Sequence, residues 1–169
     1  MFIFKKGHDS RAIANHIVDL SIAGKKNINL EQLMQFVYIS HGWVLACTNK
    51  PLIKDKIHAN RDGALLKPIK KSFEKNKNIT KKAIETDPVF GRLSFFTANL
   101  TSTERNLIRR MFNYYSKYNP YELNEEIQEI NSPWCKCFDY KKNSIISNNN
   151  IKDYYKNLFI QNKGIYSTI

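Results

Sequence analysis

The strongest periodic pattern of apolar residues lies between Asn29 and Cys47. Apolar side chains recur there at spacings of three and four, as on one face of an α-helix: Leu30, Leu33, Met34, Val37, Val44 and Leu45. Aromatic and aliphatic residues also occupy its other faces, and a helix that is apolar nearly all round is normally contacted from several sides. We therefore predict a central helix over residues 29–47, with Asn29 and Gln32 forming a capping box.

Five more segments have helical periodicity, so the pattern predicts a compact bundle of about six helices around the central one. They lie at about 10–23, 64–75, 101–117, 120–130 and 151–160, and Thr101 with Glu104 is a capping-box pattern at the start of the segment 101–117. Asp9 or Ser10 can cap the first of them, and Gly24 stops it. The helix at 64–75 could begin nearer Lys67, because Pro68 suits a first helical turn. Only a short turn joins the first helix to the central one, so we expect these two to pack as an antiparallel pair.

Signals for β-structure are weaker. Residues 53–59 alternate apolar and polar side chains, which predicts a short strand with one solvated face. Residues 75–87 are polar and lysine-rich and predict a loop, whereas residues 88–96 fit either a short strand or a packed loop. Ser132-Pro133-Trp134 predicts a turn that ends a helical unit. The fold class is therefore mainly α, or α+β with a minor short β element.

The chain has 169 residues, which suits a single domain over 1–169. We expect a core at about 9–160, flanked by tails at 1–8 and 161–169, of which residues 1–8 could instead be an edge segment. No apolar run approaches the length of about 20 residues that a membrane span needs. Three cysteines make no even disulfide framework, and the first residues do not resemble a secretion signal, so we expect a cytoplasmic protein.

The formal net charge of +12 leaves two interpretations open. The many Lys, Asn and Ile residues are typical of an A/T-rich coding sequence, and the charge could reflect composition and solubility alone. A basic surface could instead bind nucleic acid or an acidic protein. If nucleic acid is the partner, the candidate contacts are the clustered lysines Lys67, Lys70, Lys71, Lys75, Lys77, Lys81 and Lys82.

No pattern in the sequence indicates an enzyme. It contains no glycine-rich phosphate loop, no G-x-S-x-G and no H-E-x-x-H motif. Cys135 and Cys137 form a lone pair, whereas closed metal sites use four ligands. His41 falls on the apolar face of the central helix, where a hydrogen-bonded core histidine is expected. We therefore expect no catalytic residue, no metal site and no cofactor.

Aromatic residues are the candidate contacts for a protein partner, because they are enriched at the energetic centres of interfaces. We select Tyr38, Trp43, Tyr118 and Trp134, although the same residues could simply fill the core. We also predict that the Trp43 and Trp134 regions meet, with the central helix packed on the turn at Ser132. Gly42 lowers helix propensity, and we expect another backbone to pass close to it.

An ordered set of short motifs resembles the SocA-like, or Panacea, antitoxin domain, whose members are often labelled phage-associated proteins. The set comprises Tyr38, His41-Gly42-Trp43, Lys50-Pro51-Leu52, an extended piece ending at Ala59, Tyr114-Tyr115, Tyr118, Leu123 and Ser132-Pro133-Trp134. Polar positions differ from the family's usual pattern at Met34-Gln35, Ala59-Asn60, Gly63-Ala64-Leu65 and Ile127-Gln128. Because the apolar positions are kept, the resemblance implies the same fold.

The resemblance implies an antitoxin-like protein-binding module. Such a module would neutralise a cognate toxin by binding it directly, or would act as an adaptor that delivers the toxin to a protease. The alternative from another class is a basic nucleic-acid-binding protein of phage or mobile-element origin, which rests on the net charge.

Overall fold

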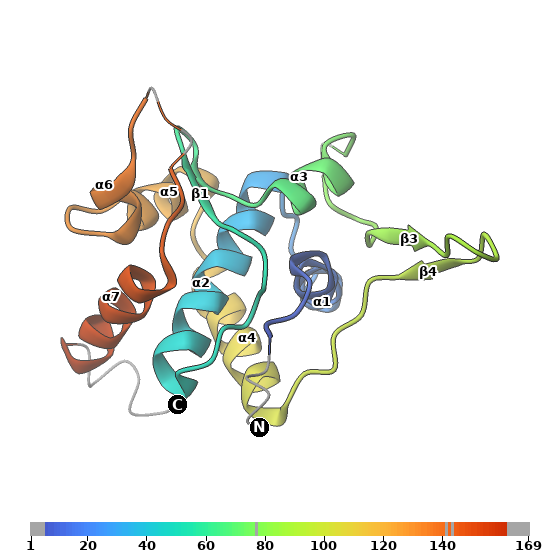
Figure 1. Ribbon diagram of the computed structural model, residues 1–169, viewed down its shortest axis with the longest axis horizontal. Helices are drawn as coiled ribbons and strands as arrows, with labels where there is room; N and C mark the ends of the chain where they lie inside the picture. Colours follow the sequence, from blue (N-terminus) through green and yellow to red (C-terminus); the bar gives the residue numbers. More distant parts are fainter. Residues whose placement is uncertain (1–5, 77, 141, 143, 162–169) are drawn as a thin grey trace.

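The computed structural model describes residues 6–76, 78–140, 142 and 144–161 (Figure 1). Within these residues the chain forms seven helices and two two-stranded sheets. The helices are α1 (Ser10–Ala23), α2 (Leu30–Thr48), α3 (Lys67–Phe73), α4 (Ser102–Tyr115), α5 (Pro120–Gln128), α6 (Pro133–Cys137) and α7 (Asn148–Gln161). The strands are β1 (His58–Asn60), β2 (Gly63–Leu65), β3 (Ile84–Thr86) and β4 (Leu93–Phe95). The predicted fold class, mainly α with a minor β element, is confirmed.

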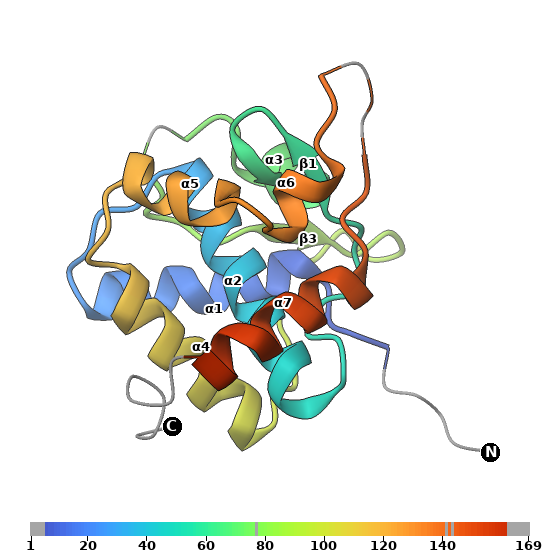
Figure 2. The same cartoon turned by 90° about the vertical axis from the view of Figure 1, so that its left-hand side faces the viewer.

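The central position of α2 is confirmed as well. Every residue from Gln32 to Leu45 is buried, as the all-round apolar pattern predicted. The helix packs against α1, α3, α4, α5, α7 and β2. Figures 1 and 2 show these elements arranged around it, with α7 on the side opposite the β3–β4 hairpin in the first view.

Several helices begin at the capping residues that were predicted for them. Asn29 and Gln32 form the capping box of α2, and Thr101 with Glu104 forms that of α4. Each box satisfies amide groups that have no partner inside the helix. Asp9 caps α1, and Gly24 follows its last residue.

The predicted antiparallel packing of the first two helices is wrong. Figure 1 shows α1 end-on while α2 runs down the view, and Figure 2 shows α1 lying across α2. Helix α1 also packs against α3 and α4, so it spans several neighbours instead of following one. Loop length limits the separation of two helices, but the apolar surfaces available to each of them set their crossing angle.

The first hairpin replaces the single predicted strand. Only His58 and Ala59 of the predicted strand lie in β1, which pairs antiparallel with β2. The turn returns through Gly63, whose φ of 105° favours glycine. Residues 64 and 65 therefore belong to a strand, and α3 begins at Lys67, the later of the two starts that the sequence allowed.

The second hairpin lies in segments predicted as a loop or left open. Strand β3 lies within the lysine-rich segment, and β4 pairs with it in the register Ile84↔Phe95, Glu85↔Ser94 and Thr86↔Leu93. Strands of three residues are too short to carry a clear alternation of their own. Figure 1 shows this hairpin projecting sideways from the helical body.

Two further assignments differ from prediction. The predicted turn at 132–134 opens a short helix, α6, and α7 starts at Asn148, three residues early. Residues 1–8 were predicted to be a tail or an edge segment, and the parallel bridge between His8 and Ile53 fits the edge segment. The predicted tail residues 1–5 and 162–169 lie outside the described residues.

The prediction that the Trp43 and Trp134 regions meet is wrong, because each indole has other partners. Trp43 packs edge-on against Tyr155 of α7, with ring centroids 5.3 Å apart. Trp134 instead donates its indole N–H to the carbonyls of Asn60 and Gly63, at 2.8 and 3.1 Å. Gly63 lies beside Gln35, about two turns of α2 before Trp43, so the two indoles lie along different parts of this helix.

Candidate partner-binding surface

The β3–β4 hairpin carries an apolar face that is open to solvent. Directly paired residues of an antiparallel ladder share one face of the sheet, so Ile84, Leu93 and Phe95 lie on the same side. Their exposed fractions are 53%, 70% and 48%. Glu85 and Ser94 form the opposite, polar face, where the Ser94 hydroxyl lies 3.5 Å from the Glu85 carboxylate.

The tip of the hairpin also exposes apolar side chains. Val89 and Phe90 have exposed fractions of 76% and 73%. Asp87 holds the turn, because its carboxylate accepts hydrogen bonds from the amides of both residues, at 2.9 and 2.6 Å. Gly91, with a φ of 65°, completes the turn. The two apolar side chains at the tip are thereby presented on a hydrogen-bonded turn.

Asn15 fixes the base of the hairpin to α1. Its side-chain amide donates to the carbonyls of Ala83 and Phe96, and its carbonyl oxygen accepts from the amide of Ala83 at 2.6 Å. Asn15 is buried. Its side chain thus hydrogen-bonds both the residue just before β3, Ala83, and the residue just after β4, Phe96. The guanidinium of Arg11 lies 3.8 Å from the Phe96 ring centroid and adds a cation–π contact. Asn15 was not predicted, since nothing local in the sequence marks an asparagine whose buried side chain hydrogen-bonds a distant hairpin.

The basic residues of this part of the chain precede the hairpin. Residues 67–96 contain eight Lys or Arg and three Asp or Glu, but within the hairpin itself, residues 83–96, Arg92 stands against Glu85 and Asp87. Lys82 pairs with Asp19 at 3.2 Å, and its ammonium lies 4.6 Å from the centroid of the Phe95 ring. The apolar face of the hairpin therefore has one paired ammonium, that of Lys82, beside the ring of Phe95.

The aromatic residues selected from the sequence lie elsewhere. Tyr38, Trp43 and Trp134 are buried in the core. Tyr118 is half-buried beside Tyr114 and Tyr115, and a hydrogen bond with Tyr114 raises the pKa of Tyr118 to about 12. The structure thus does not bring these four candidates together on one exposed patch, and their environment fits the alternative that they fill the core.

Most of the lysines selected as nucleic-acid contacts are exposed. Lys67, Lys70 and Lys71 lie on α3, and Lys75 and Lys81 lie in the segment that follows it. Lys82 is half-buried through its contacts with Asp19 and Phe95, and Lys77 lies outside the described residues. Exposed lysine side chains remain compatible with either interpretation of the net charge.

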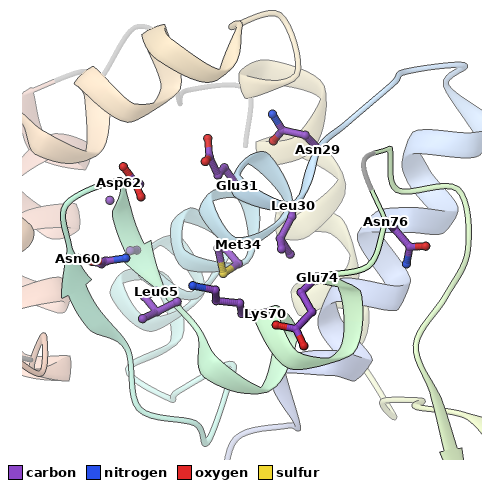
Figure 3. Close-up of a pocket in the computed structure, with 12 residues that line it drawn as sticks. Asn29, Leu30, Glu31, Met34, Asn60, Asp62, Leu65, Lys70, Glu74 and Asn76 are labelled. Carbon is purple, nitrogen blue, oxygen red and sulfur yellow. The ribbon is translucent and has the colours of Figure 1, made fainter.

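A cavity of about 300 Å³ lies between the N-terminal end of α2, the β1–β2 hairpin and α3 (Figure 3). Met34 and Leu65 contribute apolar surface, and Lys70 lies among the acidic groups of its wall, Glu31, Asp62 and Glu74. Its lining contains no hydroxyl, thiol or imidazole side chain. The cavity therefore offers carboxylates and one amine. It offers no serine, threonine or cysteine nucleophile and no histidine to act as its base.

Two other kinds of feature are absent from the described residues. Within residues 6–76, 78–140, 142 and 144–161, no cluster of three His, Cys, Asp or Glu side chains could hold a metal ion. Across the same described ranges, no helix combines the length and apolarity needed to cross a membrane.

Comparison with known proteins identifies the family. The family model described as "Antitoxin SocA-like, Panacea domain" matches residues 33–135, which is more than half of the chain. No curated protein matches this chain, and no solved structure does. The matched segment includes most of α2, both hairpins and the helices up to the start of α6. This chain therefore belongs to the SocA-like Panacea-domain antitoxin family.

Proposed function

We propose that this protein is an antitoxin-like module that neutralises a cognate toxin by binding it directly, with the β3–β4 hairpin as the contact surface. The observation that carries the proposal is the exposed apolar face of that hairpin. Side chains such as Phe90 and Leu93 gain free energy when a partner removes them from water, and soluble monomers seldom expose apolar residues contiguously without such a role. The hairpin lies inside the segment that matches the antitoxin family.

The physical form of the hairpin supports this role. A two-stranded hairpin is marginally stable alone, yet here Asn15 anchors it on a buried helix. The anchor supplies a preorganised shape, which reduces the entropy that binding must otherwise lose. The proposed action is binding without catalysis, and it requires no cofactor.

The test is co-expression with the product of the neighbouring gene. We expect this product to be toxic when expressed alone and harmless when co-expressed with the wild-type protein. We also expect the wild-type protein to retain it in a pull-down. Phe90→Ser and Leu93→Ser should each reduce retention by about tenfold or more, as loss of an interface anchor does. Ile160→Ser, an exposed apolar change on α7, is the matched control and should leave retention unchanged.

Stability measurements make this test interpretable. Because Phe90, Leu93 and Ile160 are exposed, all three serine variants should unfold within about 0.5 kcal/mol of the wild type. The proposal is contradicted if the neighbouring product is harmless alone and does not bind the wild type. It is also contradicted if the hairpin variants bind and protect as well as the wild type does.

Proteolytic adaptation is the alternative route to neutralisation. An adaptor shortens the lifetime of the toxin, whereas an inhibitor that binds directly leaves the amount of toxin unchanged or raises it. The half-life of the toxin in cells with and without this protein separates the two routes.

Nucleic-acid binding is the second candidate function, and the exposed lysines of α3 and its following segment support it. Binding would be mainly to phosphate, so affinity should fall steeply with salt. A titration against generic duplex and single-stranded DNA tests this function. Absence of binding at about 50 mM salt, where phosphate contacts are strong, would exclude it.

A further inference from the structure

Helix α4 has a solvent face that is both basic and polar. Its apolar side is buried, and the helix packs against α1 and α2. Figures 1 and 2 show α4 at the lower edge of the molecule in both views. The residues that share its opposite side are exposed, and the central ones are Arg105, Asn106, Arg109, Arg110 and Asn113. Three of the six arginines of the chain therefore lie on one helix face.

No carboxylate of α4, all of whose residues are described, offsets these three charges at the surface. Glu104 is the one acidic residue of the helix, and it is buried. Its carboxylate accepts a hydrogen bond from the Thr101 amide at 2.7 Å and lies 3.4 Å from His8 Nε2. On the neighbouring helix α1, Asp19 is paired with Lys82 at 3.2 Å. The exposed face of α4 is thus a local concentration of guanidinium groups.

We propose that the solvent face of α4 binds duplex DNA, with Arg105, Arg109 and Arg110 on its phosphates. A guanidinium matches the geometry of a phosphate with two parallel N–H donors, and asparagine can pair with the edge of adenine. The major groove of B-form DNA is about 12 Å wide and admits an α-helix with its side chains. This inference is independent of toxin binding, and it uses another surface than the lysines of α3.

Arg109 is already oriented along this face. Its Nη2 donates to Asn106 Oδ1 at 3.1 Å, a contact between residues three positions apart on the helix. The bond uses one of the five N–H donors of the guanidinium, so others can still reach a phosphate. Holding the side chain in advance reduces the entropy that it loses on binding.

The composition of the face favours DNA over other anionic partners. The exposed residues of α4 include no apolar or aromatic side chain, whereas the centre of a protein interface is usually rich in them. A helix that lies on a membrane inserts its apolar side into the lipid, and here that side is buried in the protein. Duplex RNA has a deep and narrow major groove that side chains cannot read.

The experiment measures binding of the full chain to a fluorescein-labelled duplex DNA of mixed sequence by anisotropy, at several salt concentrations. The test variant combines Arg105→Gln with Arg109→Gln. The matched control combines Lys70→Gln with Lys71→Gln, which removes the same charge from exposed positions of α3. We expect the α4 pair to weaken binding by about tenfold or more and to reduce the slope of log affinity against log salt by about 2. The α3 pair should weaken binding by less than about threefold, because charges that touch no phosphate act only at long range.

A charge-preserving variant separates phosphate contact from a loss of folding. Arg105→Lys combined with Arg109→Lys keeps both charges and should retain the salt slope of the wild type. Because all four substituted positions are exposed, every variant should melt at the temperature of the wild type. A slope that falls as far with lysine as with glutamine would contradict phosphate binding by α4.

The remaining outcomes also decide the inference. It is overturned if the wild type does not bind duplex DNA at about 50 mM salt, where phosphate contacts are strong. Equal losses from the α3 and α4 pairs would show an effect of net charge alone, and equal affinity for duplex RNA of the same sequence would exclude groove binding. If the α4 pair weakens binding to poly-L-glutamate or to vesicles of phosphatidylcholine and phosphatidylserine but not to DNA, the partner is an acidic protein or a membrane, and the inference fails.

Discussion

His41 is buried on α2, and both nitrogens of its ring have hydrogen-bond partners. Nδ1 accepts from the amide of Ile53 at 3.3 Å, which leaves the proton on Nε2, and Nε2 donates to Asn148 Oδ1 at 2.9 Å. The ring therefore links α2 to the segment before β1 and to the first residue of α7. Burial lowers the pKa of His41 to about 4, although the bond to Asn148 acts in the opposite direction.

This lowered pKa predicts a loss of stability in weak acid. Below pH 6.5 the unfolded chain takes up a proton at His41 that the native state does not bind. The free energy of unfolding should therefore decrease as pH falls from about 6.5 to 4, by up to about 3 kcal/mol from this group. Urea unfolding at a series of pH values measures it.

His41→Gln provides the control for this prediction. Glutamine keeps a donor near the position of Nε2 but does not titrate, so the variant should be less stable near pH 7 and depend less on pH. His16, whose pKa is also lowered, mainly by burial, contributes equally to both proteins and cancels in the difference. Parallel pH profiles for the wild type and the variant would contradict the assignment.

At the scale of elements, the contact between α2 and α7 depends on Gly42. A Cβ atom built at Gly42 would overlap the ring of Tyr155. The expectation that another backbone passes close to Gly42 is thus wrong, since an aromatic ring fills the space. Tyr155 also makes edge contacts with Tyr38 and Trp43, so glycine lets this ring enter the aromatic cluster of α2.

We expect Gly42→Ala to destabilise the protein although alanine is the better helix former. The gain in helix propensity is about 1 kcal/mol. Overpacking typically costs about 1–3 kcal/mol, and the buried Tyr155 ring can move only if α7 moves with it, so we predict the upper part of that range. Denaturant titration gives the net value.

A double variant checks the mechanism of this effect. Tyr155→Ala removes the ring, so adding Gly42→Ala to it should cause no further loss of stability. Such non-additivity is expected when two residues compete for one space. If Gly42→Ala is equally destabilising with and without the Tyr155 ring, the steric explanation is incorrect.

At the scale of the whole molecule, Trp134 joins parts of the chain that are distant in sequence. Its N–H bridges the carbonyls of Asn60 and Gly63 across more than 70 residues, and its ring stacks on Phe138 with centroids 4.3 Å apart. Helix α6 packs in turn on α5 and α7. Trp134 thus connects the β1–β2 turn to the C-terminal helices.

Two substitutions separate the contributions of Trp134. Trp134→Ala should cost about 3–5 kcal/mol, as the loss of a buried aromatic side chain usually does. Trp134→Phe keeps much of the packing but leaves two carbonyls without their donor, and should cost about 1–3 kcal/mol. Chemical denaturation measures both values. Equal losses would show that packing is not the larger contribution.

The sequence alone was sufficient for features that depend on a segment's own residues. The central helix, its burial on all sides and the capping boxes at Asn29 and Thr101 were predictable, because periodicity and caps act within a few residues along the chain. The ordered motifs around Trp43 and Pro133 also indicated the family that the 33–135 match identified. Apolar positions keep a fold even where polar ones differ.

Only the tertiary structure decided which aromatic side chains are exposed. Trp43 and Phe90 are both large aromatic residues, yet one is buried against α7 and the other lies exposed on the hairpin tip. The surface depends on the pairing of β3 with β4 and on the hydrogen bonds of Asn15. These contacts join residues up to about 80 positions apart. Periodicity describes the faces of one element, but the burial of a face depends on the free energy of packing against elements elsewhere in the chain. The candidate surface therefore emerged from the long-range contacts, whereas the fold class and the family were already encoded in local patterns.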